Sequence, residues 1–297
     1  MMFIIINALL YTIGWWLTVY WGATSYYTSA WLPSLVIVLG QLIYLYRVDP
    51  KAFYQDLFLV LYALMIGYGM EFVFTRLGLI MYSDQPQTVT LWILMLYPAF
   101  VLTFNYSMKW LNDKRVYPIL LGMFSPLVYL CGYKMGACLF PMGFWAMSLV
   151  VIPCWCLFLH LMCNLNRRLK NIVYQVFKSE GKGVTMLYDG ECPLCSKEVG
   201  WMLKGCPTQV KFINIADPMY DAEKYNNLDY KTAMQAMHAI DAEGNTLVGV
   251  EAFAEIYAAL NWRLLSLLMR VPVFKQIASI GYYFFAKYRL RLTGRNL

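Results

Sequence analysis

The first 46 residues of the chain contain no Asp, Glu, Lys or Arg. As one helix rising about 1.5 Å per residue they would extend about 69 Å, more than twice the roughly 30 Å hydrocarbon core of a bilayer. A charge-free segment of this length therefore predicts two membrane-spanning helices joined by a turn. We expect the turn at residues 22–30, between Trp21 and Trp31, with Pro33 opening the second span.

The density of charged residues in the 297-residue chain rises sharply after residue 166. Residues 1–166 contain 7 basic and 5 acidic residues, whereas residues 167–297 contain 17 and 12. With 60% hydrophobic residues overall, the chain is too apolar for a single soluble domain, and its charged second part excludes a wholly embedded protein. The net charge of +7 includes no block of five like charges, so nucleic acid is not an expected partner.

Further apolar segments at residues 57–75, 89–108, 116–133 and 143–165 complete an all-α membrane part with about six transmembrane helices. The expected partner of this part is the lipid bilayer. Eight basic residues near the span ends fall on one side, and only Arg76 and Lys134 fall on the other. Because basic residues favour the cytoplasmic side, this bias predicts that both termini and the charged second part are cytoplasmic.

Polar side chains inside the predicted spans are candidates for an intramembrane site, because each is costly in hydrocarbon. They are Asn7, Gln41, Glu71, Asn105 and Ser107. They either join the helices through hydrogen bonds or form a proton or substrate site around Glu71 and Asn105. Arg76 lies close to one helical turn after Glu71 and is a candidate partner in an ion pair.

Two stretches of the membrane part, FNYSMKWL at residues 104–111 and SPLVYLCG at residues 125–132, resemble an uncharacterised bacterial inner-membrane family. The resemblance covers about residues 1–140 and implies a location in the bacterial inner membrane, but no activity. The membrane part also holds five cysteines, which we expect to pack as small buried residues. A thiol relay across the membrane is the alternative. These cysteines are Cys131, Cys138, Cys154, Cys156 and Cys163.

Residues 167–182 combine basic residues with apolar positions at helical spacing, which predicts an amphipathic helix at the membrane interface followed by a short linker. The chain is therefore expected to consist of a membrane domain at 1–166, this juxtamembrane helix and linker at 167–182, and a separate domain at 183–297.

The separate domain opens with a β-rich run at residues 184–188, followed directly by DGECPLC at residues 189–195. A strand leading into a helix that starts with C-x-x-C is typical of a redox-active dithiol. The free amides and the dipole at a helix N-terminus favour a Cys192 thiolate, and Pro193 suits the first turn. Cys195, three residues further on, is placed to form or resolve a disulfide with Cys192.

Downstream, the pattern predicts a strand at 210–215, a helix near 230–236, a hairpin of strands at 237–241 and 246–249, and a helix at 250–260. The resulting order, β-α-β-α-β-β-α, is that of a thioredoxin-like α/β domain. Residues 262–285 predict two C-terminal amphipathic helices that rest on the membrane, separated at Pro272. The basic residues expected to face anionic lipid are Lys287, Arg289, Arg291 and Arg295.

Four separated blocks resemble the DCC family of thiol-disulfide oxidoreductases: DGECPLC at 189–195, MHAID at 237–241, GVEAF at 249–253 and YRLRL at 288–292. The resemblance spans about residues 184–292. It implies a thioredoxin-like fold and dithiol chemistry at Asp189, Cys192 and Cys195, without a known substrate. Two features depart from thioredoxin itself, because Met186 occupies the place of its buried acid and no proline precedes the strand that starts at Met237.

Supporting roles in the motif remain open. Asp189 either accepts a proton from Cys195 or caps the turn, and Gly190 belongs to the same turn. His238 either tunes Cys192 or is a satisfied core histidine.

The leading interpretation is a membrane-anchored thiol-disulfide oxidoreductase in which Cys192 attacks and Cys195 resolves. It acts on a disulfide-bearing protein or a small thiol substrate and needs no cofactor or metal. One alternative is a transmembrane thiol-electron conduit or transporter that uses the soluble domain as electron donor or regulator. The other is a zinc-stabilised interaction module, less favoured because no second close pair exists, with ligands Cys192, Cys195, Cys206 and His238.

Overall fold

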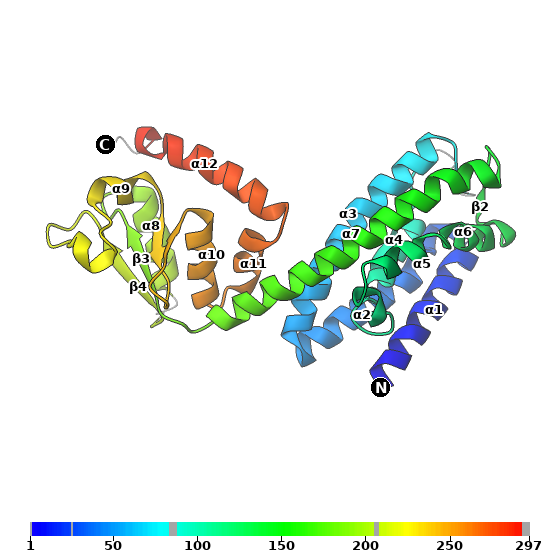
Figure 1. Cartoon of the computed structure of the whole chain (residues 1–297), viewed down its shortest axis with the longest axis horizontal. Coiled ribbons are helices and arrows are strands. Elements are labelled where there is room, and N and C mark those ends of the chain that lie inside the picture. Colours follow the sequence, from blue (N-terminus) through cyan, green and yellow to red (C-terminus); the bar gives the residue numbers. More distant parts are fainter. Residues whose placement is uncertain (1, 25, 83–87, 205–207, 293–297) are drawn as a thin grey trace. The chain divides into compact units, whose positions relative to one another are not determined.

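The computed structural model of the chain describes residues 2–24, 26–82, 88–204 and 208–292. The chain forms two compact units, residues 1–170 and residues 171–297. A single helix, α7 (Phe144–Ser179), begins in the first unit and ends in the second (Figure 1).

The described residues of the first unit are helical, apart from one short antiparallel pair of strands, β1 (Met81–Tyr82) and β2 (Cys138–Leu139), and the connections between elements. Its helices before α7 are α1 (Met2–Gly22), α2 (Leu32–Val48), α3 (Pro50–Arg76), α4 (Leu91–Val101), α5 (Val116–Gly122) and α6 (Ser125–Lys134), with the 3-10 turns η1 (Tyr27–Ser29) and η2 (Lys109–Asn112).

Within the described part of the chain, four helical segments are long and apolar enough to cross a membrane. They are α1, α3, the α5–α6 segment and α7, and a bent C-terminal helix pair in the second unit would make a fifth if it were one span. The remaining two predicted spans coincide with α2 and α4, which are apolar but only 17 and 11 residues long. The described part of the chain thus has four to five segments of membrane length, four of them beginning in the first unit, where the sequence predicted about six.

The span predicted at residues 89–108 is helical only over α4, and the turns that follow it explain the difference. The carbonyl of Leu102 accepts hydrogen bonds from the side chains of Asn7 (3.3 Å) and Gln41 (3.2 Å). Asn112 donates in the same way to the carbonyl of Phe104 (2.8 Å). Side-chain hydrogen bonds therefore satisfy backbone carbonyls that helical hydrogen bonds would otherwise satisfy. A hydropathy pattern does not show where such side-chain hydrogen bonds form.

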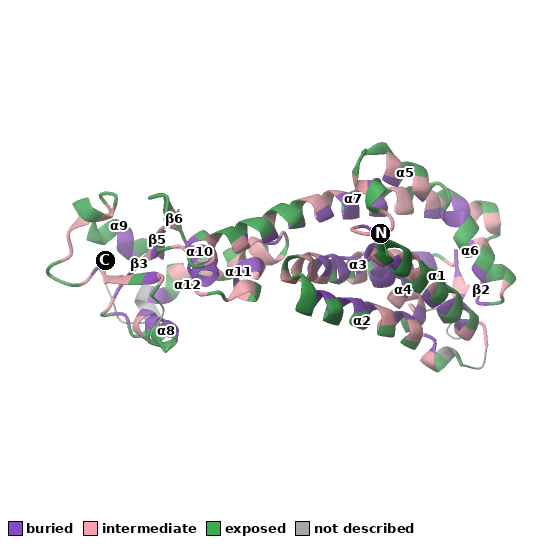
Figure 2. Cartoon of the chain, turned by 90° about the horizontal axis from the view of Figure 1, so that it is seen from below, coloured by how far each residue is buried: buried purple, intermediate pink, exposed green. Residues whose placement is uncertain are grey.

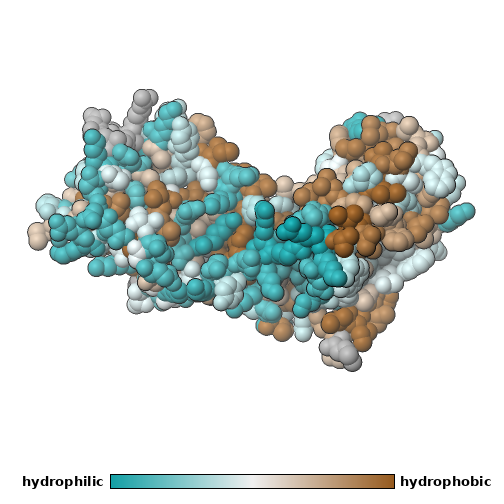
Figure 3. All heavy atoms as spheres, in the orientation of Figure 1, coloured by the Kyte–Doolittle hydropathy of each residue, from teal (hydrophilic) through white to brown (hydrophobic). Residues whose placement is uncertain are grey.

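The outer faces of the first unit are apolar. Large side chains such as Leu9 on α1, Val36 on α2 and Leu149 on α7 are exposed. Figure 2 shows exposed residues along the outer sides of these helices, and Figure 3 shows brown, hydrophobic surface over this unit. An apolar exterior of this extent suits lipid as the surrounding solvent.

Helix α7 includes most of the segment at 167–182 that the sequence predicts to be a juxtamembrane helix and linker. The predicted sixth span and that helix form one continuous helix of 36 residues. The chain contains no glycine or proline between Pro153 and Gly181, so nothing in it interrupts the helix where the charged residues begin.

The second unit is built on a four-stranded mixed sheet. The strands are β3 (Val184–Tyr188), β4 (Val210–Asn214), β5 (His238–Ile240) and β6 (Thr246–Val248), in the order β4-β3-β5-β6. β3 pairs with β4 in parallel, and β3 with β5 and β5 with β6 antiparallel. The helices of this unit are α8 (Pro193–Leu203), η3 (Ala222–Tyr225), α9 (Tyr230–Gln235), α10 (Val250–Ala259), α11 (Arg263–Arg270) and α12 (Phe274–Leu292).

Alternating side chains of β3 supply the cores on the two faces of this sheet. Met186 packs with Val199 of α8 and Ile256 of α10 on one face. Leu187 packs with Met234 of α9 on the other. The predicted β-α-β-α-β-β-α order is present, and the mixed sheet is consistent with a thioredoxin-like domain.

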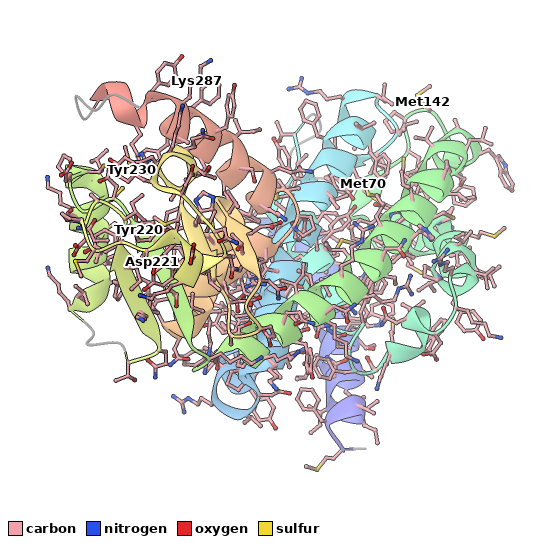
Figure 4. All side chains as sticks on the ribbon, turned by 60° about the vertical axis from the view of Figure 1, so that its left-hand side comes forward. Met70, Met142, Tyr220, Asp221, Tyr230 and Lys287 are labelled. Carbon is pink, nitrogen blue, oxygen red and sulfur yellow. The ribbon has the colours of Figure 1, made fainter. Side chains whose placement is uncertain are left out.

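The C-terminal helices α11 and α12 pack against this unit and meet at a bend of 88°. The Ser266 hydroxyl of α11 donates to the carbonyl of Ala254 (2.7 Å), and the Tyr282 hydroxyl of α12 accepts from the backbone amide of Met237 (2.7 Å). Lys287, labelled in Figure 4, is exposed on α12, whereas Arg289 is buried. The prediction that Arg289 faces lipid is therefore wrong.

Candidate active site

Cys192 occupies the N-cap position of α8, and Pro193 is the first residue of the helix. The Cys192 backbone has extended angles, φ −82° and ψ 115°, and its carbonyl accepts the first helical hydrogen bond from the amide of Ser196 (2.9 Å). Proline costs nothing at this position, because the first amides of a helix have no partner within it. The sulfur of Cys192 therefore lies at the positive end of the helix dipole.

A network of hydrogen bonds fixes the loop before Cys192. The Asn214 side-chain oxygen accepts from the amides of Gly190 (2.8 Å) and Ala216 (3.0 Å). The Ser196 hydroxyl donates to the Gly190 carbonyl (2.8 Å). A Cβ atom on residue 190 would lie only 2.4 Å from the Asn214 side chain, so a larger residue here would displace that side chain from its hydrogen bonds. Asn214 was not among the predicted site residues, although it ends the second strand next to the motif.

Asp189 lies at the start of this loop and is buried. One carboxylate oxygen accepts a hydrogen bond from the amide of Glu191 (3.1 Å), and the Asp189 carbonyl accepts from the amide of Cys192 (3.2 Å). Asp189 therefore caps the turn, which was one of its two predicted roles. The carboxylate is also close enough to Cys195 to act on the thiol electrostatically.

Both motif sulfurs are buried, with Cys192 1% and Cys195 4% exposed, and neither is in a disulfide. Burial raises the pKa of Cys195 to about 12, and a hydrogen bond with Cys192 and the charge of Asp189 act in the same direction. Arg289 opposes this shift. At neutral pH Cys195 is therefore a thiol that must lose its proton before it can attack a disulfide.

Arg289 contacts Cys195 from α12, 94 residues further along the chain. Its Nη1 lies 3.6 Å from the Cys195 sulfur, and its Nη2 donates to the carbonyl of Met234. The arginine is 5% exposed. A buried cation beside a thiol favours the thiolate. The only sequence signal for this contact was the YRLRL block, which the family resemblance singled out without a role.

His238 lies on β5 and is buried, with Nδ1 2.8 Å from the carbonyl of Ala236. Over the ranges that the structure describes, no hydrogen bond joins His238 to either motif cysteine. Its neighbour Met237 donates its amide to Tyr282 and accepts from the amide of Gly249 (2.8 Å), which ties β5 to α12 and α10. A tuning role for His238 stays a prediction.

Zinc binding has little support in the described residues, where no group of three or more His, Cys, Asp or Glu side chains is arranged to hold a metal ion. The zinc hypothesis also needs Cys206, which lies outside the described residues.

The polar residues of the membrane part form two separate sets. Asn105 donates to the buried carboxylate of Asp56 (2.7 Å), and the Ser107 hydroxyl donates to Asn7 (2.6 Å), which is itself bonded to Gln41 (2.9 Å). These contacts join α1, α2 and α3 to the turns after α4, as interhelical hydrogen bonds were predicted to do. Asp56, at the centre of this set, was missed because it lies near a predicted span end.

Glu71 belongs to the other set and has different partners. Its carboxylate accepts hydrogen bonds from the hydroxyls of Tyr82, Tyr97 and Tyr129. The Arg76 guanidinium stacks over the ring of Phe72 at 5.2 Å, and no ion pair to Glu71 is found among the described residues. Asn105 and Glu71 thus have no hydrogen-bond partner in common in this part of the chain.

The five membrane cysteines are free thiols. Cys138 contacts the carbonyl of Tyr129 (3.7 Å), and Cys156 contacts that of Ile119 (3.3 Å). In the described structure no disulfide joins any two of them, so the thiol relay stays a prediction.

A cysteine pair at the start of a helix that follows a central strand defines a dithiol redox site on an α/β domain. Residues 186–295 match the DCC1-like thiol-disulfide oxidoreductase family, and residues 4–161 match DUF2878, a family of unknown function. The chain belongs to the DUF2878 family through its membrane part, and its C-terminal domain is a DCC1-like thiol-disulfide oxidoreductase. Both resemblances seen in the sequence are confirmed.

Among curated proteins, an uncharacterized chloroplastic protein of Arabidopsis thaliana is 37% identical over 120 residues. The match covers 40% of this chain and 56% of the Arabidopsis protein, so the chain spans just over half the length of that relative. No solved structure was found to match the chain significantly.

Proposed function

We propose that this protein is a multi-pass membrane oxidoreductase whose thioredoxin-like domain reduces disulfides, with Cys192 as nucleophile and Cys195 as resolving thiol. The observation that carries the proposal is the position of Cys192 at the N-terminus of α8, with Cys195 beside it and in contact with the Arg289 guanidinium.

The proposed reaction has two exchange steps. The Cys192 thiolate attacks one sulfur of a substrate disulfide, which forms a mixed disulfide and releases the first substrate thiolate. Cys195 then loses its proton and attacks the Cys192 sulfur, which forms the Cys192–Cys195 disulfide and releases the second substrate thiolate. A thiol reductant restores the dithiol by the reverse exchange.

Asp189 and Arg289 act on the second step. Burial keeps Cys195 protonated, so the step needs an acceptor for its proton and a charge that stabilises the resulting thiolate. Asp189 supplies the acceptor and Arg289 the positive charge. Because Cys192 is buried as well, the side chains around it move before a substrate sulfur reaches it.

The proposed setting is a bacterial inner membrane crossed six times, with both termini and the redox domain in the cytoplasm. The domain limits that we propose are 1–166 for the membrane domain, 167–182 for the connecting segment and 183–297 for the redox domain. In a reducing cytoplasm the resting state is the dithiol, which favours disulfide reduction over disulfide insertion.

The test uses the full-length protein in detergent with a protein disulfide substrate and a thiol reductant. We expect Cys192→Ser to abolish turnover and Cys195→Ser to trap a mixed disulfide between Cys192 and the substrate, visible by non-reducing electrophoresis. Cys131→Ser, which alters an exposed membrane cysteine, is the matched control and should leave turnover unchanged. Turnover by Cys192→Ser at the wild-type rate would refute the assignment.

A further inference from the structure

The first unit encloses a cavity of about 240 Å³ whose walls are almost entirely apolar and aromatic. Trp15 of α1, Trp92 and Tyr97 of α4 and Trp155 of α7 line it. An apolar cavity of roughly 150 Å³ already holds a benzene ring, so this one has room for a larger flat molecule. Aromatic walls favour a flat ring, because ring faces and edges pack against each other.

One wall of the cavity is held rigid by Glu71. The Tyr82 hydroxyl donates to Oε2 at 2.5 Å, and the hydroxyls of Tyr97 and Tyr129 donate to Oε1 at 2.6 and 2.8 Å. The indole of Trp155 donates in turn to the Tyr129 oxygen at 3.3 Å. These residues come from α3, β1, α4, α6 and α7, so a single network positions rings from across the unit.

Two residues that line the cavity carry a buried polar side-chain atom without a hydrogen-bond partner in the described structure, namely Nε1 of Trp92 and Oγ of Ser125. Both residues are buried, at 3% and 6% exposed. An indole N–H is a donor only, and an unpaired buried donor is costly in an apolar environment. Both atoms are covered by their neighbours, so the two side chains have to shift before they can bond a molecule in the cavity. A ligand with acceptor oxygens would then satisfy both groups, because each of them can donate a hydrogen bond.

A second, more open hollow lies next to the cavity. It shares Tyr11, Trp15 and Val128 with the cavity and lies between α1 and α6. Its rim includes Leu127 and Cys131, whose side chains are exposed on the apolar exterior. This hollow is where a molecule dissolved in the bilayer would approach the cavity, with the shared side chains of Tyr11, Trp15 and Val128 between the two.

We propose that this cavity binds a lipophilic ring with carbonyl oxygens, of the quinone class. Flat aromatic walls select the ring, and the unpaired donors of Trp92 and Ser125 select carbonyl acceptors. A lipid acyl chain would leave both donors unpaired. An organic cation would find Glu71 already engaged with three hydroxyl donors.

The test compares two probes of the same shape on the full-length protein in detergent, by isothermal titration calorimetry. The probes are 2,3-dimethyl-1,4-naphthoquinone and 2,3-dimethylnaphthalene, which lacks the oxygens; the methyl groups block addition of protein thiols to the quinone ring. We expect the quinone to bind about tenfold more tightly, which is the effect of satisfying buried donors. Trp92→Phe and Ser125→Ala should each reduce this preference and leave binding of the hydrocarbon unchanged.

Matched controls are Trp110→Phe, at an exposed indole outside the cavity, and Ser148→Ala, at a buried serine whose hydroxyl bonds the Phe144 carbonyl (2.7 Å). Both should keep the preference for the quinone. Equal binding of the two probes, binding of neither, or a preference that survives both cavity variants would overturn the proposal. If Trp92→Phe does not fold, Ser125→Ala decides the outcome alone, because it removes only one oxygen.

Discussion

Arg289 contacts the motif cysteine Cys195 in this dithiol site. A guanidinium 3.6 Å from a buried sulfur stabilises the charged form of the thiol. The pKa of Cys195 is nevertheless raised to about 12, so burial outweighs the arginine. If Cys195 is the resolving thiol, as we propose, we expect its small thiolate fraction to limit the resolving step.

Removing this cation should slow resolution. Arg289→Met is expected to raise the pKa of Cys195 further, because it removes the positive charge that stabilises the thiolate. Below the pKa of Cys195, its thiolate fraction rises tenfold per pH unit. The assay measures release of a chromogenic thiol from a mixed disulfide at Cys192. This release should become faster as the pH rises, and it should be slower in Arg289→Met than in the wild type at each pH. Arg289→Lys should recover part of the rate, because it keeps the charge. Superimposable pH profiles for wild type and Arg289→Met would show that the contact is only structural.

The Asn214 side chain occupies the space that a Cβ atom on residue 190 would take. Gly190→Ala should displace the Asn214 side chain, lose hydrogen bonds to two amides and cost about 1–3 kcal/mol of stability. Gly200→Ala, in α8, should be neutral or stabilising, because no atom lies within 4 Å of the place that its Cβ would take. Thermal unfolding and the rate of disulfide formation would check the pair, and equal behaviour of the two variants would argue against the role of Asn214.

Helix boundaries in the membrane part depend on contacts that local sequence does not contain. α4 is short because side chains of α1 and α2 donate hydrogen bonds to the carbonyl of Leu102, just after it. The close packing of α5 against α7 likewise depends on residues that are far apart in the sequence. A Cβ on Gly122 would lie 2.7 Å from backbone atoms of Cys156.

This packing predicts opposite effects for two glycines in helices. Gly122→Ala should destabilise the membrane part by about 1–3 kcal/mol, because the backbone of α7 would have to move. Gly40→Ala, in α2 with open space around it, should be neutral or stabilise its helix by about 0.5–1 kcal/mol. Unfolding in detergent by heat would measure both. If Gly122→Ala unfolds at a temperature no lower than Gly40→Ala does, the backbones of α5 and α7 are not in close contact at Gly122.

The molecule as a whole consists of a DUF2878 membrane part and a DCC1-like domain in one chain. Basic residues are concentrated at the span ends on one side of the membrane, which predicts that the N-terminus is cytoplasmic. With an even number of spans, the C-terminus is then cytoplasmic as well. A green fluorescent protein fused to the C-terminus should then fluoresce, and alkaline phosphatase at the same position should be inactive. Alkaline phosphatase fused after Gly78, which follows α3, should be active.

An active C-terminal phosphatase would instead indicate an odd number of spans. It would also reverse the direction of redox chemistry that we propose, since an extracytoplasmic compartment is oxidising.

The amino-acid sequence alone was sufficient to define the division into an apolar and a charged part, the redox motif and both family relationships. These features depend on composition and on residues that are adjacent in the chain. Composition determines which solvent a segment prefers, and the spacing of adjacent residues determines the local structure they form. The folded structure was needed to show that Arg289 contacts Cys195, that Asn214 fixes Gly190, and that Glu71 binds three tyrosines instead of Arg76. Those pairs are 11 to 94 residues apart, and no local spacing encodes which distant side chain fills a buried site.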